Sequence, residues 1–414
     1  MPWWAACAFV VAGVAAQMMR TWLAGGLQVQ RQAVLAALQQ PGAAVAAAAA
    51  AATTDQELVV VANPISGSGC GPHIFHELLR PVLESVGLRS RLVLTCHAGH
   101  ARQIAAQLEV EKTAALILIS GDGMVHEVCQ GLADKCGGDV AQLRALFKRV
   151  PLGLIPAGSS NGLAASFGSF NLVDACLAII SGTPQPLDLS AVTLHPPSPA
   201  RPLTLFDAHA FCAGNFADHD RLVEGKLRWL GPTVKGLVGA AVSIVTRTSY
   251  AGRLDFLPAT AAFASDEERQ TKRYASVEAL PLAKSEGWRR IEGNFIGLNA
   301  FNTDWGASDA YICPFNPRAG GSVDLLVIRA TVTVGGRTRG VGRWEMVQAF
   351  LKLEAGEHLQ HPFFERYRAS RWEYTPLELD TDREKTTLDL SGQQYPLSAA
   401  SGIVHRGVAR VLAL

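Results

Sequence analysis

The chain lacks the features that define several common functional classes. Its eight cysteines are scattered and form no Cys-x-x-Cys pair, so neither a zinc site nor a disulfide scaffold is favoured. The formal net charge is only +1, and nucleic-acid binding needs a concentrated basic surface, so we expect no nucleic-acid partner. Of the 414 residues, 49% are hydrophobic, which is enough for two medium-sized domains with full cores.

Two histidines, His97 and His100, have a spacing that could suit a metal ion. No pair of partnering ligands stands near them in the sequence, so we interpret them as loop residues. The sequence alone assigns no metal ligand.

The first 55 residues differ in composition from the rest of the chain. Residues 3–19 are nearly all apolar, and residues 43–52 form an almost pure alanine tract. The apolar run is intermediate in length between the core of a signal peptide and a marginal membrane span. For residues 1–55, a membrane anchor, an interfacial helix and a poorly ordered leader therefore all stay open.

Two glycine-rich segments carry most of the functional information. Residues 114–119 are an unbroken apolar run, typical of a strand buried in a parallel sheet, and residues 121–123 read Gly-Asp-Gly. Residues 152–156 are a second such strand, followed by the small residues of 158–161. Sheets of α/β proteins bind ligands at the carboxyl ends of their strands, and glycines let backbone amides approach an anion. The two segments together predict a phosphate site.

A third glycine-rich loop, residues 63–71, follows the β-branched strand 58–62. It has no Lys-Ser/Thr after its glycines and lacks the spacing of a dinucleotide fingerprint, so it predicts a phosphate-binding loop of another kind. The strand, loop and helix order then repeats, which predicts a doubly wound parallel sheet over residues 56–186.

The pattern of apolar and polar residues changes at about residue 187. Short strands separated by Pro, Gly and polar turns predict a second, mainly β domain over residues 187–414. Within it, the charged run 265–273 indicates a solvated surface loop, and residues 344–354 indicate an amphipathic helix. The arginines before that helix could face anionic lipid, although a solvent-facing basic turn is the simpler interpretation.

Three motifs resemble, in order and spacing, the catalytic domain of diacylglycerol and sphingosine kinases; they lie at residues 63–67, 120–128 and 156–166. Within that superfamily, His126-Glu127 and the continuation at 163–166 are most similar to sphingosine kinases. The resemblance extends from about residue 58 to the C-terminus. It implies an N-terminal α/β nucleotide domain of phosphofructokinase-like type and a C-terminal β-sandwich that holds the lipid.

The resemblance implies an ATP-dependent kinase that uses Mg²⁺ and phosphorylates the primary hydroxyl of a sphingoid long-chain base to its 1-phosphate. Such a transfer needs a carboxylate to take the hydroxyl proton, and Asp122 is the candidate general base. The alternative that Asp122 orients Mg²⁺ or a loop amide stays open.

The resemblance also assigns binding residues. Those bordering ATP are Asn63, Pro64, Ile65, Ser66, Gly67, Thr95, Gly99, Glu127, Gly158, Ser159, Ser160, Arg228, Ser391, Gly392 and Gln393. Those bordering the lipid are Ser120, Gly121, Asp122, Gly123 and Asp220. Asp220 corresponds to a carboxylate that recognises the substrate amine, a role that Asp218 could share, and such a charge favours a cationic sphingoid base over an uncharged lipid.

One departure from the family pattern concerns residues 391–393. The family usually has Asp-Gly-Glu near the nucleotide and its metal, whereas this chain has Ser-Gly-Gln, although Asp389 could partly compensate. The change keeps open a weakly active or non-catalytic lipid-binding homologue. A diacylglycerol or ceramide kinase stays open as a separate alternative.

The expected partners are a sphingoid-base lipid and a membrane surface, and we expect a cytoplasmic, membrane-associated protein. The sequence does not fix the oligomeric state, and a homodimer is one option.

Overall fold

The computed structural model describes residues 25–39, 56–227, 232–246, 248–259, 266–283, 287–378 and 387–414. The apolar run 3–19 and the alanine tract 43–52 lie outside these residues. Residues 25–38 are helical, and Leu27, Val34 and Leu38 on this helix are buried against the N-terminal part of the fold. Among the described residues, no helix is long and apolar enough to cross a membrane.

The N-terminal part is a parallel sheet covered by helices on both faces. Its strands are β1 (Glu57–Ala62), β2 (Ser90–Leu94), β3 (Thr113–Ser120) and β4 (Leu152–Pro156), in the order β4-β3-β1-β2. Alternate strand residues face opposite sides, so Val59 and Leu116 lie in one core whereas Val60 and Ile117 lie in the other.

Each core is closed by its own set of helices. One face is covered by α5 (His100–Ala106), α6 (Asp122–Lys135) and α7 (Val140–Arg149). The other is covered by the continuous helical segment of α3 (Gly71–His73), η1 (Ile74–Leu79) and α4 (Arg80–Ser85), and by α9 (Leu172–Ser181). The short α8 (Gly162–Ser166) follows β4, and η2 (Val110–Lys112) precedes β3. The predicted doubly wound α/β architecture is confirmed.

The C-terminal part is rich in antiparallel strands, as predicted. These are β5 (Thr183–His195), β6 (Leu203–Asp207), β7 (Ala210–Gly214), β8 (Tyr250–Pro258), β9 (Arg289–Phe301), β10 (Val323–Arg329), β13 (Phe364–Pro376), β14 (Thr387–Leu390), β15 (Gln393–Pro396) and β16 (Ala399–Ala413), with the hairpin β11 (Thr331–Val334) and β12 (Arg337–Gly340). The helices are α10 (Asn215–Arg221), η3 (Leu222–Lys226), α11 (Pro232–Thr246), α12 (Asp266–Thr271), α13 (Arg343–Phe350) and η5 (Glu357–Gln360).

Two helices of the C-terminal part differ from the sequence-based expectations. The interpretation of residues 265–273 as a loop was wrong for Asp266–Thr271, which form α12 and are followed by an ion pair between Lys272 and Glu268 at 2.7 Å. A run of good helix formers with an i,i+4 pair explains that helix. The predicted amphipathic helix at 344–354 is present as α13 but ends at Phe350.

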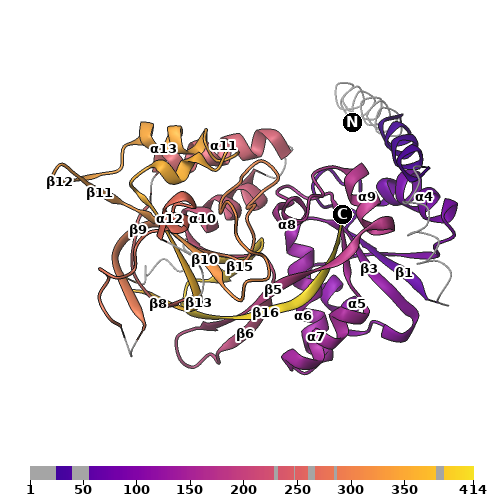
Figure 1. Ribbon diagram of the computed structural model, residues 1–414, viewed down its shortest axis with the longest axis horizontal. Coiled ribbons are helices and arrows are strands. Elements are labelled where there is room, and N and C mark those ends of the chain that lie inside the picture. Colours follow the sequence, from indigo (N-terminus) through magenta and orange to yellow (C-terminus); the bar gives the residue numbers. More distant parts are fainter. Residues whose placement is uncertain are drawn as a thin grey trace, which may run out of the picture.

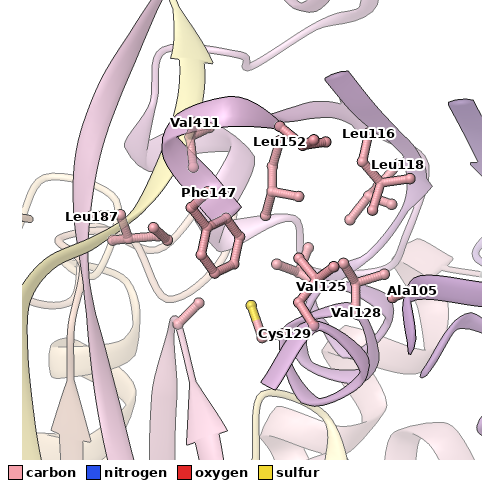
Figure 2. Close-up of a cluster of buried hydrophobic side chains, with 14 of the residues drawn as sticks. Ala105, Leu116, Leu118, Val125, Val128, Cys129, Phe147, Leu152, Leu187 and Val411 are labelled. Atoms are coloured by element: carbon pink, nitrogen blue, oxygen red, sulfur yellow. The ribbon is translucent and has the colours of Figure 1, made fainter. Parts of the chain in front are cut away.

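The two parts share one continuous sheet. In Figure 1 the N-terminal part lies on the right, the C-terminal part lies on the left, and β5 and β16 run between them. β16 pairs antiparallel with β5 over much of its length and parallel with β4 at Val411 and Leu152. Val411 and Leu187 of β5 thereby pack beside Phe147 of α7 (Figure 2). β5 crosses the boundary expected between residues 186 and 187, and the division into two domains stays a prediction.

Candidate active site

The turns after β3 and β4 lie against each other. The two strands pair in parallel, with Ser120 opposite Pro156, so both chains leave the sheet at the same edge. The approach is so close that a Cβ on Gly158 would overlap the Cα of Gly121. Only glycine permits this contact between two backbones, and it brings the two predicted phosphate turns into one site.

The carboxylate of Asp122 lies at the start of both α6 and α8. Its Oδ2 accepts the amide N–H of Gly162 and its Oδ1 accepts that of Leu163, each at 3.0 Å. The turn is further held by Asn161, whose Oδ1 accepts the amide of Gly158 at 2.8 Å. Asp122 therefore does orient loop amides, and its two oxygens keep lone pairs for a further proton or cation.

The loop after β1 completes this edge. Its backbone passes so close to the β4 turn that a Cβ on Gly67 would overlap the carbonyl of Ala157. Asn63 Oδ1 accepts the amide of Ile65 at 3.0 Å, which fixes the start of the loop. The predicted loop residues Asn63, Pro64, Ile65, Ser66 and Gly67 and the predicted turn residues Gly158, Ser159 and Ser160 thus border the same place.

Glu127, one turn and a half along α6, holds the loop after β2. Its Oε1 accepts the amide of Gly99 at 2.9 Å and its Oε2 accepts that of Ala101 at 3.2 Å. Thr95 is buried, and its amide donates to Ala62 O at 3.0 Å. The carboxylate of Glu127 therefore holds the predicted ATP loop in place by accepting backbone amides of that loop.

The β14–β15 turn reaches the site from the C-terminal part. A Cβ on Gly123 would lie 3.4 Å from Gln393 Nε2 and from Ser391 O, so the turn packs on the first turn of α6. Ser391, with φ of 50°, turns its hydroxyl inward and donates to Asp207 Oδ1 at 2.6 Å. Of the predicted residues 391–393, Gln393 has its side chain beside Gly123, whereas the Ser391 hydroxyl is buried away from it.

Two carboxylates meet beside this turn. Asp220 of α10 lies with Oδ2 3.9 Å from the position of a Cβ on Gly392, and Asp389 shares a side-chain hydrogen bond with Asp220. Asp389 also accepts the Gly392 amide at 2.9 Å and the Gln394 side-chain amide at 2.6 Å. Burial first, and then the charge of Asp220, raises the pKa of Asp389 well above its usual value. The sequence analysis assigned Asp220 to the substrate amine and considered Asp389 a compensating group at the turn, but it did not predict their direct contact.

Asp218, the alternative amine ligand, is engaged elsewhere. Its Oδ2 accepts the Tyr250 hydroxyl at 2.5 Å, and its Oδ1 lies 3.6 Å from Arg221 Nη2. Burial raises the pKa of Asp218, while the Tyr250 hydrogen bond and the Arg221 charge oppose the rise. Its side chain thus links α10 to β8.

A buried polar network beneath α6 was missed by sequence reasoning. His126 Nδ1 lies 3.0 Å from Asp207 Oδ1, and His126 Nε2 lies 3.3 Å from the Tyr395 hydroxyl. His126 and Asp207 are each 2% exposed. Because these partners are 81 and 269 residues away in the sequence, no local pattern could have identified them. The predicted Arg228 lies outside the described residues.

Comparison with known proteins gives consistent matches. Residues 57–192 match the family model of the diacylglycerol kinase catalytic domain. The chain is 25% identical over 353 residues to sphingosine kinase 1 of Arabidopsis thaliana, covering 81% of this chain and 68% of that protein. It is 26% identical over 367 residues to human sphingosine kinase 1, covering 84% and 88%. It is 24% identical over 366 residues to mouse ceramide kinase, covering 82% and 66%.

A solved structure supports the fold. The crystal structure of a diacylglycerol kinase from Bacillus anthracis str. Sterne superposes with a TM-score of 0.53 at 13% identity, covering 87% of this chain and 97% of that chain. At this identity the likeness concerns the fold alone.

Proposed function

We propose that this lipid kinase, whose residues 57–192 match the diacylglycerol kinase catalytic domain, phosphorylates the primary hydroxyl of a sphingoid long-chain base. Lipid kinases of this family use ATP. Its matches include kinases of a sphingoid base and of ceramide, so the choice between these substrates depends on the site.

The contact between Asp220 and Asp389 is the observation on which we base the choice of substrate. Burial, and next the charge of the neighbouring Asp220, raise the pKa of Asp389 and so favour its protonated form. A sphingoid base has an ammonium group that can replace this proton, whereas ceramide and diacylglycerol have no cation to offer. The pair therefore favours the amine-bearing lipid.

Asp122 is the proposed general base. Because the amides of Gly162 and Leu163 hold its carboxylate in place, it can accept the proton of a substrate hydroxyl without reorganising. The backbone turns at 63–67, 121–123 and 158–160 would hold the phosphates of ATP. Carboxylate and phosphate oxygens are the donors that Mg²⁺ prefers, so Asp122 could share a Mg²⁺ ion that neutralises the phosphate charge.

The change at Ser391 and Gln393 is the observation that favours a second candidate, a weakly active or non-catalytic lipid-binding homologue. Neither side chain supplies charge to a metal. Among the described residues, the carboxylates beside the turn include Asp389 and Asp220, which we assign to the substrate amine, and Asp207, which accepts the Ser391 hydroxyl.

One experiment separates these possibilities. We would measure transfer of labelled γ-phosphate from Mg-ATP to sphinganine, ceramide and diacylglycerol in mixed micelles. We expect transfer to sphinganine, a loss of about 10²–10⁴-fold in kcat for Asp122→Asn, and a KM for sphinganine raised about tenfold or more for Asp220→Asn. The preference for sphinganine should increase as pH rises and the carboxylate pair ionises.

The matched control is Glu354→Gln, an exposed residue, which should behave as wild type. Preferential transfer to ceramide or diacylglycerol would contradict the assignment of the substrate. Lipid binding without transfer to any lipid would support the non-catalytic homologue.

A further inference from the structure

Three side chains of the kinds that bind metal ions meet in the turn after β2. Cys96, His97 and His100 each place one ligand atom within 4.8 Å of the others. Cys96 and His97 are exposed, and His100 is half-buried. The sequence analysis found no pair of partnering ligands for the two histidines, but the fold of the turn places the Cys96 sulfur beside them.

The distances suit a tetrahedral ion. Cys96 Sγ lies 3.3 Å from His100 Nδ1. In a tetrahedral zinc site with Zn–S of about 2.3 Å and Zn–N of about 2.0–2.1 Å, the sulfur and nitrogen are separated by about 3.6 Å. A shift of a few tenths of an ångström in an exposed turn therefore suffices to admit the ion between them.

The imidazole of His97 is held in a form that can bind a metal ion. His97 Nδ1 lies 2.8 Å from the carbonyl oxygen of Ala98, which can only accept, so Nδ1 carries the proton and Nε2 keeps its lone pair. Such a hydrogen bond to the second ring nitrogen is the usual support of a metal-binding histidine. His100 Nδ1 accepts the Cys96 amide at 3.1 Å, so this hydrogen bond must open before the Nδ1 lone pair can bind an ion. The two rings stack with centroids 4.9 Å apart.

The chemistry of the three ligands selects the ion. One thiolate and two imidazoles suit zinc and similar borderline-soft cations, whereas Mg²⁺ prefers oxygen ligands. Cys96 is exposed and can reach an ion from solvent, whereas Cys129, Cys176 and Cys212 are buried.

We propose that Cys96, His97 and His100 form a binding site for Zn²⁺, with three protein ligands and a fourth position open to solvent. The site lies between Thr95 and Ala101, in the loop that Glu127 holds through the amides of Gly99 and Ala101. An ion bound here would restrain that loop. Its binding does not depend on the proposed kinase substrate.

The test uses Co²⁺ as a spectroscopic substitute for Zn²⁺ in the full chain, after removal of bound metal with a chelator. A tetrahedral Co²⁺–thiolate complex has intense d–d bands and a sulfur-to-metal charge-transfer band. We expect these bands to saturate at one Co²⁺ per chain and to disappear when Zn²⁺ is added. Cys96→Ser should abolish the charge-transfer band, and His97→Gln should weaken Co²⁺ binding about tenfold or more.

The controls are Cys70→Ser, in the neighbouring glycine-rich loop, and His76→Gln, an exposed histidine on η1. Both should bind Co²⁺ as the wild type does. The absence of a thiolate band in the wild type, or its persistence in Cys96→Ser, would overturn the proposal. Because His97→Gln leaves the thiol in place, a weakened but still visible band in this variant separates loss of a ligand from loss of fold.

Discussion

Two carboxylates on α6, Asp122 and Glu127, organise loops that follow other strands. Asp122 receives the amides at the start of α8, and Glu127 receives those of Gly99 and Ala101 at the start of α5. A carboxylate that accepts amides at a helix N-terminus both satisfies their hydrogen bonds and interacts favourably with the helix dipole. One helix thereby fixes the position of two turns of the proposed nucleotide site.

We predict that Glu127→Ala loosens the loop after β2. Two amides at the start of α5 lose their acceptor, which should cost about 1–2 kcal/mol of stability and raise the KM for ATP more than it lowers kcat. Hydrogen exchange at residues 96–101 should become faster. The exposed Gln142→Ala on α7 serves as control, and unchanged exchange in Glu127→Ala would contradict the role we assign to the carboxylate.

At this scale the sequence located backbone features better than side-chain contacts. The turns at Gly121 and Gly158 were predictable because parallel strands end at the same edge of a sheet. The contacts of His126 with Asp207 and Tyr395 were not, because they join segments that only tertiary packing brings together. Cys96 directly precedes His97 in the sequence, but only the fold of the turn shows that the ligand atoms of Cys96, His97 and His100 lie within 4.8 Å of one another.

Among the elements, β10 and β13 are joined by a buried ionic cluster. Asp324 of β10 is fully buried and accepts from Arg366 at 2.5 Å, from Arg368 at 3.1 Å and from the Tyr274 hydroxyl. The Arg366 guanidinium also lies 4.0 Å from the centroid of the Tyr274 ring. Removing one partner of such a cluster leaves the other charges buried and uncompensated.

We therefore predict that Asp324→Asn destabilises the C-terminal part by about 3–5 kcal/mol. Urea denaturation followed by tryptophan fluorescence would measure the change, with the exposed Asp309→Asn as a control of equal charge. A change below about 1 kcal/mol would show that the arginines find other acceptors.

Element types were well predicted wherever the pattern was strong. The apolar runs of β1, β3 and β4 identified buried parallel strands, because helices cover both faces of that sheet. The helix α12 was missed, since its charged residues are equally typical of a solvent-exposed loop. The pairing of β16 with β5 could not be inferred, because the two strands lie about two hundred residues apart and no local sequence pattern identifies such a distant partner.

On the scale of the whole molecule, α11 and α13 lie together and present an exposed apolar surface. It consists of Val242, Val245, Trp344, Phe350 and Leu351, whose exposed fractions range from 38% to 73%. Arg343 connects the two helices by donating to Val245 O at 3.2 Å. In Figure 1 both helices lie at the top of the C-terminal part, and α11 packs against α10, which bears Asp220. Apolar side chains with a neighbouring cation suit an anionic bilayer, so we predict that the expected membrane contact is made through this surface.

We predict that Trp344→Ala combined with Leu351→Ala lowers binding to phosphatidylserine-containing vesicles about tenfold or more, since two large apolar side chains no longer enter the bilayer. Co-sedimentation measures the binding. The control pair, Leu203→Ala with Leu282→Ala, removes two exposed leucines elsewhere, at 44% and 64% exposure, and should leave binding intact. Equal loss in both pairs would contradict a specific membrane surface.

The sheet shared by the two parts has a consequence for synthesis on the ribosome. Residues 57–192 match the catalytic family. Three residues buried in the cores of this α/β part, Val408, Val411 and Leu412, come more than two hundred residues later in the chain. The nascent α/β part therefore emerges long before the strand that completes its sheet. Until β16 arrives, the exposed edges of β4 and β5 need protection by chaperones or by transient contacts of the chain itself.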